Sequence, residues 1–369
     1  MGEKKLVDHQ KSLAQAIALR DSEQVNIKYT SIELCAGAGG QALGLHKAGF
    51  HHKLLVELDE HACKTLELNN SEHNLGWEQI SRRCLIEFSE NGVDKYAGID
   101  LVAGGVPCPP FSKAGQQLGR DDERDLFPVA LEVVKKCMPK AVMLENVRGL
   151  LDPKFADYRG EIEGTLKGLG YEVKWKLLNA CDFGVPQLRP RVILVASSPE
   201  VMQFFEWPEP KKKPPTVGDA LYDLVAENGW PGAAKWRDKA NKIAPTLVGG
   251  SKKHGGPDLG PTRAKREWKE LHVNGHRIGD SAPDREFSGF RQGYEDMPLL
   301  TTRMAARIQG FPDWWEFFGK KTASYRQIGN AFPPPVAEAV GRQIIRAFRK
   351  VDESRGTVIQ SLDQELASA

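Results

Sequence analysis

A short apolar segment, followed at once by glycines and then by a helical pattern, limits what this chain can fold into. Residues 29–34 form the apolar run, residues 35–40 read Cys-Ala-Gly-Ala-Gly-Gly, and residues 41–48 place Leu43 and Leu45 on the inner face of a predicted helix. A strand, a glycine turn and a helix in this order are typical of α/β sheets whose chain passes close beneath a ligand. The pattern therefore predicts an α/β fold with a ligand site at this turn.

An acidic residue closes the next predicted strand. Residues 53–56 are the strand, and Glu57 follows it, twenty residues after Gly37. An acid at this place in dinucleotide-binding sheets accepts the ribose hydroxyls. The glycine spacing is Gly-x-Gly-Gly rather than GxGxxG, and each feature alone also fits a tight turn or a solvated glutamate. Together they predict a site for an adenosine-containing cofactor.

Cys108 stands in an unusual setting after a third predicted strand. Residues 99–105 are apolar and end in two glycines, and Pro107, Pro109 and Pro110 then bracket the cysteine. Proline fixes φ and lacks an N–H donor, so Cys108 belongs to neither a helix interior nor a central strand. We expect it in a stiff loop at the carboxyl end of a core strand, where open α/β sheets bind ligands. The alternative is a small buried thiol.

A carboxylate and two arginines follow two further predicted strands. Glu145 ends the apolar run 141–144, which should desolvate it and favour its protonated form. Arg189 and Arg191 lie two residues apart in an extended segment, so we expect them on one face. The connection into the strand at 192–196 is short, which predicts an antiparallel strand whose start lies beside Cys108 and Glu145. The alternatives are a helix-capping or Arg148-paired glutamate and two surface arginines.

Composition changes after residue 196. Residues 197–300 are rich in Pro, Trp, Lys and Gly, and residues 235–277 hold eleven Lys/Arg against four Asp/Glu around a glycine-rich centre. Such a segment suits contacts to phosphates and base edges, or else forms a solvated loop. We divide the chain into a polar extension (1–28), a catalytic and cofactor-binding domain (29–196), a second, smaller and irregular domain (197–300), a return to the first domain (301–350) and a frayed tail (351–369).

Overall composition excludes several classes of protein. The net charge is only +2, so any basic surface is local, and the six cysteines are scattered without metal-ligand spacing. We therefore expect no metal and no disulfide scaffold. No apolar run reaches the roughly 18 residues that a membrane helix needs. These features predict a cytoplasmic protein with reduced thiols and no membrane partner.

Six motifs in this order resemble those of the DNA (cytosine-5) methyltransferase family, in its bacterial, single-chain form. The resemblance runs from about residue 30 to residue 348. It rests on Ala36-Gly37-Ala38-Gly39-Gly40, Gly105-Val106-Pro107-Cys108, Glu145-Asn146-Val147, Gln187-x-Arg189-x-Arg191, Arg307-Ile308-Gln309-Gly310-Phe311-Pro312 and Gln327-Ile328-Gly329-Asn330. The family often has Phe at Cys35, an aromatic residue at Val106, Gln at Pro109 and Asp at Cys84, so we assign no adenine-binding acid to Cys84.

The resemblance implies a Rossmann-like sheet, mostly parallel with one antiparallel strand, and a target-recognition domain at 197–300, called the recognition region below. It implies methyl transfer from S-adenosylmethionine to C5 of a cytosine flipped out of a specific double-stranded DNA sequence, leaving S-adenosylhomocysteine. The implied catalytic residues are Cys108, which forms a covalent bond to C6, Glu145, Arg189 and Arg191. The implied cofactor-binding residues are Cys35, Ala36, Gly37, Gly39, Gly40, Glu57, Leu58 and Asn330. The implied DNA-contacting residues are Ser112, Gln187, Thr246, Leu247, Gly249, Gly250, Ser251, Lys252 and Lys253.

Other functions compete with this one. A branch of the same family modifies transfer RNA, although the large recognition region favours DNA, because reading a duplex needs surface for the major groove. A catalytically silent DNA-binding relative and, remotely, a nicotinamide-dependent oxidoreductase are the further alternatives. We expect a monomer. The recognised DNA sequence, a cognate restriction endonuclease and the base that removes the C5 proton are not encoded in any residue pattern.

Overall fold

The computed structural model describes residues 29–107, 125–210, 213–249 and 258–368, with side chains of the last helix described to residue 355. Seven strands form one sheet in the order β3-β2-β1-β4-β5-β7-β6. Every neighbouring pair is parallel except those that β7 makes with β5 and β6. The predicted sheet with one antiparallel strand is therefore confirmed. The strands are β1 (Tyr29–Leu34), β2 (Phe50–Glu57), β3 (Ile80–Arg82), β4 (Leu101–Gly104), β5 (Ala141–Val147), β6 (Glu172–Asn179) and β7 (Pro190–Ser197).

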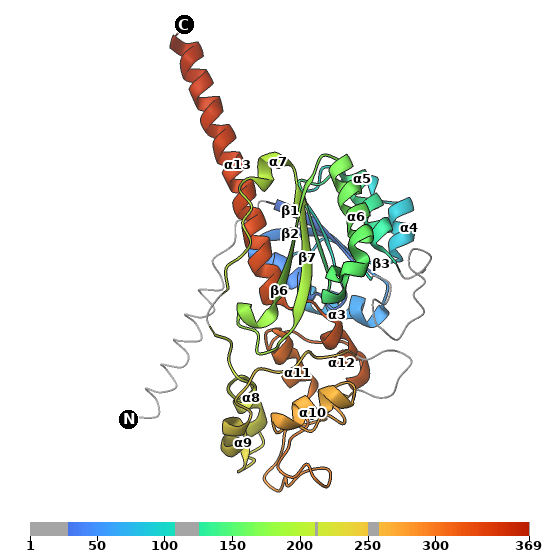
Figure 1. Ribbon diagram of the computed structural model, residues 1–369, viewed down its shortest axis with the longest axis vertical. Coiled ribbons are helices and arrows are strands. Elements are labelled where there is room, and N and C mark those ends of the chain that lie inside the picture. Colours follow the sequence, from blue (N-terminus) through green and yellow to red (C-terminus); the bar gives the residue numbers. More distant parts are fainter. Residues whose placement is uncertain (1–28, 108–124, 211–212, 250–257, 369) are drawn as a thin grey trace.

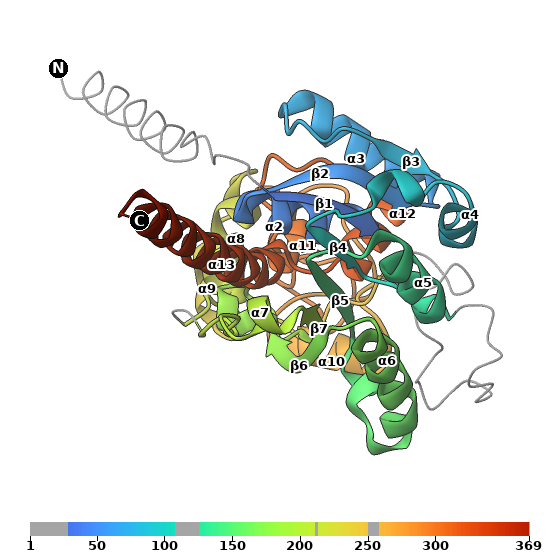
Figure 2. The same ribbon diagram turned by 90° about the horizontal axis from the view of Figure 1, so that it is seen from above.

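Helices cover both faces of the sheet, as Figures 1 and 2 show. On one face the helices α2 (Gly40–Ala48), α7 (Pro199–Met202) and α13 (Pro334–Ser368) pack over Leu101 and Ala103. On the other, α4 (Leu85–Glu90), α5 (Phe127–Cys137) and α6 (Ala156–Gly168) pack over Val102. The alternation along β4 follows from the two-residue period of a strand, and both of its faces are apolar because both are covered.

The start of the recognition region, with α7, packs on the sheet, and the rest of the region lies below the sheet in Figure 1. Its helices are α8 (Val217–Ala226), α9 (Ala233–Lys239) and α10 (Thr262–Glu270), joined by irregular segments. One hydrophobic core joins Leu221, Trp236 and Trp268 of this region to Leu43 and Leu66 on α2 and α3 (Glu60–Glu72). The helices α11 (Thr302–Gln309) and α12 (Lys321–Asn330) contribute to the same core. The region is thus built onto the catalytic domain through buried contacts.

The end of the chain differs from the sequence prediction. The tail that we expected to fray over 351–369 continues α13 to Ser368. Ile344, Phe348 and Val351 are buried along that helix, so its apolar stripe extends into the predicted tail. No helix in the described ranges is both long enough and apolar enough to cross a membrane.

Candidate active site

A cavity of about 480 Å³ opens at the carboxyl ends of β1, β2, β4 and β5. The order of the strands reverses between β1 and β4, which is where open α/β sheets bind their ligands. The predicted cofactor residues that line it are Cys35, Ala36, Gly37, Gly40, Glu57, Leu58 and Asn330. Gly39 does not line it, because its position lies against Leu66 and Trp315. We call this space the cofactor cavity.

The glycine turn lets two parts of the chain approach each other closely. Gly37 and Gly39 have φ values of 55° and 85°, in the left-handed region that glycine adopts without strain. A Cβ on Gly40 would overlap the carbonyl oxygen of Phe332, just before α13. The turn therefore forms one wall of the cavity while the start of the last helix packs directly against it.

Glu57 lies at the end of β2, as the sequence predicts. One carboxylate oxygen accepts from Gly37 N at 2.7 Å, and the other from Leu58 N and Asp59 N at 2.8 and 2.7 Å. These bonds fix the carboxylate beside the glycine turn. Leu58 is 63% exposed, although its neighbours along β2 are buried. An exposed aliphatic side chain beside a fixed carboxylate suits the flat base and the ribose of an adenosine group.

Glu145 lines the cavity at the end of β5 and pairs with Arg191. The Arg191 Nε atom donates to Glu145 Oε1 at 2.7 Å, and both side chains are 13% exposed. Arg191 lies opposite Val147 in the antiparallel pair of β5 and β7, so the predicted strand direction brings the two groups together. Burial raises the pKa of Glu145, while the nearby guanidiniums of Arg191 and Arg189 lower it in part. The result is a carboxyl group disposed to hold a proton.

The segment that leads to Cys108 reaches the same wall. Gly105 and Pro107 line the cavity with Glu145, and a Cβ on Gly105 would lie 3.1 Å from Glu145 Oε2. Asn146 Nδ2 donates to Val106 O at 3.1 Å and so holds this segment against β5. Cys108 itself lies outside the described residues, as do Ser112, Gly250, Ser251, Lys252 and Lys253.

Arg189 is buried and bonds to two segments far along the chain. It is 1% exposed, donates to Leu247 O at 2.8 Å and to Gly329 O at 2.7 Å, and does not line the cavity. The placement of Arg189 and Arg191 on one face stays a prediction, and both guanidiniums are near enough to Glu145 to lower its pKa. Arg189 therefore joins the recognition region to α12, and Arg191 forms the ion pair with the buried acid.

Several residues that were predicted to contact DNA are buried inside the protein instead. Gln187 is fully buried, donates to Gln309 Oε1 and accepts from Leu247 N, each at 2.8 Å. Leu247 is 1% exposed, and Gly249 is buried against Gly329 of α12. For these three residues the predicted DNA contact is wrong. Thr246 donates its hydroxyl to Leu188 O at 2.6 Å.

Several residues at the site were not predicted from the sequence. Glu33 on β1, Asp59, Cys84, and Arg326 of α12 all line the cavity. Glu33 carried a signal, since it is a carboxylate inside the apolar strand that leads to the glycine turn. Arg326 carried none beyond its place one helical turn before Asn330. Leu188 and Val248, 50% and 42% exposed, flank the buried Leu247 segment with apolar surface.

Comparisons with known proteins point to one family. Residues 29–346 match the family described as C-5 cytosine-specific DNA methylase. The chain is 54% identical to the Type II methyltransferase M.NgoMIV of Neisseria gonorrhoeae, over 88% of this chain and 99% of that one. It is 53% identical to the Type II methyltransferase M.NaeI of Lentzea aerocolonigenes, over 89% of this chain and 78% of that one.

A solved structure shows the same fold. It is the Entamoeba histolytica methyltransferase EhMeth, which superposes with a TM-score of 0.60 at 16% identity and covers 88% of this chain and 99% of its own. The match of the family over most of the chain, and two relatives above 50% identity, identify the kind of enzyme. The chain belongs to the C-5 cytosine-specific DNA methylase family and is a DNA cytosine-5-methyltransferase.

Proposed function

We propose that the chain transfers a methyl group from S-adenosylmethionine to C5 of a cytosine flipped out of a specific DNA duplex, through a bond between Cys108 and C6. The observation that carries this proposal is that Glu145, which is paired with Arg191, lines the same cavity as the glycine turn and Pro107, the neighbour of Cys108. The same cavity is therefore lined by residues predicted to bind the cofactor and by residues next to the predicted nucleophile.

The residues present fit S-adenosylmethionine. The cavity is of the size that a nucleoside-containing ligand requires. Glu57 suits the ribose hydroxyls, Leu58 and Leu85 offer apolar surface for the base, and Glu33 Oε2 is buried without a hydrogen-bond partner. An unpaired buried carboxyl oxygen at a cavity wall suits a ligand with a cationic group. When bound, this donor supplies an electrophilic methyl group.

The chemistry of cytosine explains why these side chains are needed. C5 is a poor nucleophile, so the Cys108 thiolate adds to C6 and Glu145 gives its proton to N3, which leaves an enamine. C5 then takes the methyl group, a base removes the C5 proton, and the C6–S bond breaks to restore the aromatic ring. Arg191 holds Glu145 at Oε1, which leaves Oε2 on the side of Gly105.

The base must leave the duplex, because C5 and C6 are inaccessible inside it, at a cost of roughly a few kcal/mol. Residues 108–124 and the basic segment at 250–257 are our candidates to fill the gap and hold the strand. Thr246, beside the exposed Leu188 and Val248, remains a candidate for contact with the duplex. Because phosphate contacts release counterions, binding should weaken as salt rises.

The partners of the enzyme are inferred from its relatives. Both similar proteins are called Type II methyltransferases, a name that refers to restriction–modification systems. We infer that this chain protects the recognition sequence of a cognate endonuclease by methylating it. We infer also that it acts as a monomer in the cytoplasm.

Transfer of labelled methyl groups to duplex DNA and to transfer RNA tests the substrate. We expect labelling of duplex DNA alone, and bisulfite sequencing of DNA from expressing cells to reveal one recurring sequence. Cys108→Ser should abolish labelling, and duplexes with 5-fluorocytosine should trap a covalent adduct only with the unchanged cysteine. Full activity of Cys108→Ser, or labelling of transfer RNA instead of DNA, would refute the proposal.

A further inference from the structure

Two successive carbonyl groups before Cys108 are held by two different segments of the catalytic domain. Asn146 of β5 donates to Val106 O at 3.1 Å, and the Leu126 N–H donates to Pro107 O, also at 3.1 Å. The Pro107 carbonyl is part of the planar peptide group that joins Pro107 to Cys108. The position of Leu126 therefore bears directly on the backbone at Cys108.

Leu126 lies at the start of α5, and Asp125 fixes this start. Asp125 Oδ1 accepts from the Phe127 N–H at 3.1 Å, one of the donors that a helix N-terminus leaves without a backbone partner. The helix dipole also favours a negative charge there. Phe127 is 1% exposed and belongs to the core beneath α5 and α6. The backbone at Leu126 is thus held between a carboxylate and a buried ring.

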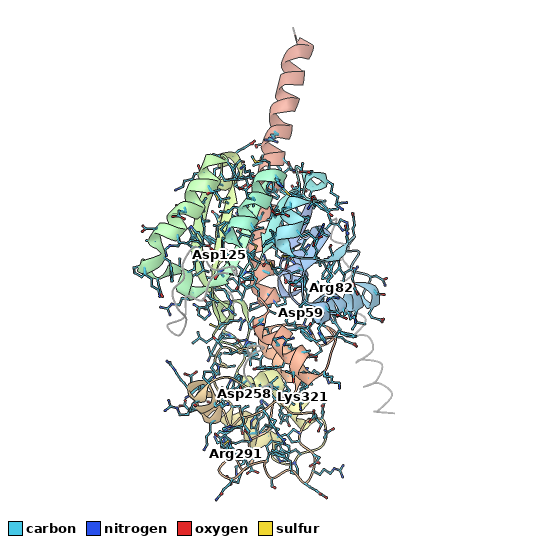
Figure 3. The ribbon with its side chains drawn as sticks, turned by 90° about the vertical axis from the view of Figure 1, so that its right-hand side faces the viewer. Asp59, Arg82, Asp125, Asp258, Arg291 and Lys321 are labelled. Atoms are coloured by element: carbon cyan, nitrogen blue, oxygen red, sulfur yellow. The ribbon has the colours of Figure 1, made fainter. Side chains whose placement is uncertain are left out.

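Tyr158 of α6 in turn holds this carboxylate. Its hydroxyl lies 2.7 Å from each oxygen of Asp125, and a bond to a charged acceptor is stronger than one between neutral groups. The Tyr158 ring meets that of Phe127 edge-on, with the centroids 6.3 Å apart. Figure 3 shows Asp125 on the catalytic domain, above Asp59 and above the recognition region that carries Arg291. The contact therefore belongs to the catalytic domain.

Tyr158 and Asp125 stand outside the cofactor cavity. Neither lines it, and both are half-buried, whereas Leu126 and Pro107 do line it, together with Glu145. The Tyr158 hydroxyl can thus affect the reaction only at a distance, through its bond to Asp125 and through the start of α5. The four residues form one chain of contacts from α6 to the cavity wall.

We propose that Tyr158 is a positioning residue for Cys108. Through Asp125 and Leu126 it fixes the peptide group of Cys108, and this proposal rests on the proposed function, in which Cys108 is the nucleophile. A shift of about 1 Å in a reacting group, caused from a distance, costs about a hundredfold in rate. Loss of the hydroxyl alone leaves the ring in place, so we expect a smaller shift and a cost of about tenfold.

The rate of covalent adduct formation reports the placement of Cys108. The probe is a saturating duplex with the sequence that bisulfite sequencing reveals and 5-fluorocytosine at the methylated position, mixed with the full chain and S-adenosylmethionine. Tyr158→Phe should slow adduct formation by about tenfold and leave the affinity for S-adenosylhomocysteine within about twofold of the wild type. Asp125→Ala should slow it at least as much, and Tyr158→Phe added to Asp125→Ala should have no further effect.

Tyr171→Phe is the matched control. The Tyr171 hydroxyl donates to Pro139 O at 2.6 Å, and its ring belongs to the same core as Phe127. Pro139 precedes β5, so this bond lies at the end of the strand away from Glu145. Tyr171→Phe should therefore lower the midpoint of urea denaturation at least as much as Tyr158→Phe does, while adduct formation keeps the rate of the wild type.

Three results would overturn the proposal: an unchanged adduct rate in Tyr158→Phe, equal slowing in Tyr171→Phe, or effects of Tyr158→Phe and Asp125→Ala that multiply in the double variant. A parallel loss of affinity for S-adenosylhomocysteine in Tyr158→Phe would also contradict it, because the whole cavity would then have changed. A wild type that forms no adduct would refute the proposed function itself, which the variants alone cannot do.

Discussion

Glu33 shows how one side chain connects the sheet to the cavity. It lies in β1, is 1% exposed, and has one oxygen without a hydrogen-bond partner. Burial raises its pKa well above the usual value, a backbone hydrogen bond from Ala42 opposes this, and the charge of Glu57 adds to it. The carboxyl group is thus protonated in the folded protein at a pH where an unfolded chain would already have released the proton.

The pH dependence of stability should reveal this proton. Above the unfolded pKa of 4.5 the unfolded chain loses a proton that folded Glu33 keeps, so the free energy of unfolding falls as pH rises towards the folded pKa. Glu33→Gln has no such proton. Its stability relative to the wild type should increase as pH rises above the unfolded pKa towards the folded pKa, by at most about 1.4 kcal/mol per pH unit.

Urea denaturation of the donor-free protein measures this difference. Glu209→Gln is a suitable control, because Glu209 is exposed, and its profile should parallel that of the wild type. A constant difference between Glu33→Gln and the wild type across this pH range would show that Glu33 is ionised in the folded protein.

Asn146 acts on the neighbouring segment rather than on a substrate. Its amide holds Val106 O, two residues before Cys108. Asn146→Ala leaves that carbonyl without its partner, which should cost about 1–3 kcal/mol of stability and lower kcat. The affinity for S-adenosylhomocysteine should remain within about twofold, because Val106 does not line the cavity. Steady-state kinetics with calorimetry would detect a contrary result as a parallel loss of donor affinity.

At the scale of elements, the contact of α2 with the start of α13 depends on glycines. Gly40 lies against Phe332 O, and a Cβ on Gly44 would come within 3 Å of Ala337 and Glu338. Gly40→Ala should therefore force the two helices apart, reduce stability by several kcal/mol and weaken donor binding, since Gly40 and Phe332 both line the cavity.

Gly164→Ala on α6 is the matched control. This position is exposed, and no atom lies within 4 Å of an added Cβ. Replacing a helical glycine there should stabilise the protein by about 0.5–1 kcal/mol without a change in donor affinity. Thermal unfolding and calorimetry on both variants make the comparison. Equal behaviour of the two would show that the close approach at Gly40 has no energetic role.

The spacing of apolar residues in the sequence predicted those helices and strands in which such residues recur regularly. The predicted strand at residues 29–34 coincides with β1, and the predicted helix at 41–48 coincides with α2 except for its first residue. The predicted strand at 53–56 is shorter than β2, because His51 and His52 interrupt the apolar run although His52 is buried and bonded to Ser31 and Ala42. The polar helix α12 was not predicted, because its place is determined by contacts with distant segments.

At the site, too, local sequence predicted some residues, whereas contacts with distant segments determine the roles of others. Chemistry-bearing residues at strand ends were predicted, because parallel strands deliver them to one edge. The roles of Gln187, Arg189 and Gly249 were not, since they depend on partners far along the chain: Gln309, Leu247 and Gly329. A resemblance in motif order shows that such residues matter, and only the fold distinguishes an internal anchor from a contact with the substrate.

Across the whole molecule, Arg189 connects three parts of the chain. Its guanidinium binds carbonyls at Leu247 in the recognition region and at Gly329 in α12, next to Asn330 of the cavity wall. Arg189→Met leaves both buried carbonyls unpaired, which should cost about 3 kcal/mol. Hydrogen exchange should then increase at residues 247–249 and 326–331, and the affinities for donor and DNA should fall together.

Arg191→Met provides the contrast. It should lower turnover through Glu145 while exchange at those two segments stays as in the wild type. If Arg189→Met instead kept its stability and its exchange pattern and lost only turnover, Arg189 would act in catalysis, as the sequence alone predicts.

The backbone contact between Gly249 and Gly329 has a practical consequence for chimaeras that exchange sequence specificity between relatives. A Cβ on either glycine would collide with the other segment. A transplanted loop must therefore retain glycine at this crossing and the Thr-Leu pair before it, whatever bases it is chosen to read. Transplanted segments whose ends lie between residues 197 and 243, or after residue 258, leave this crossing intact. A junction within residues 244–249 disrupts it.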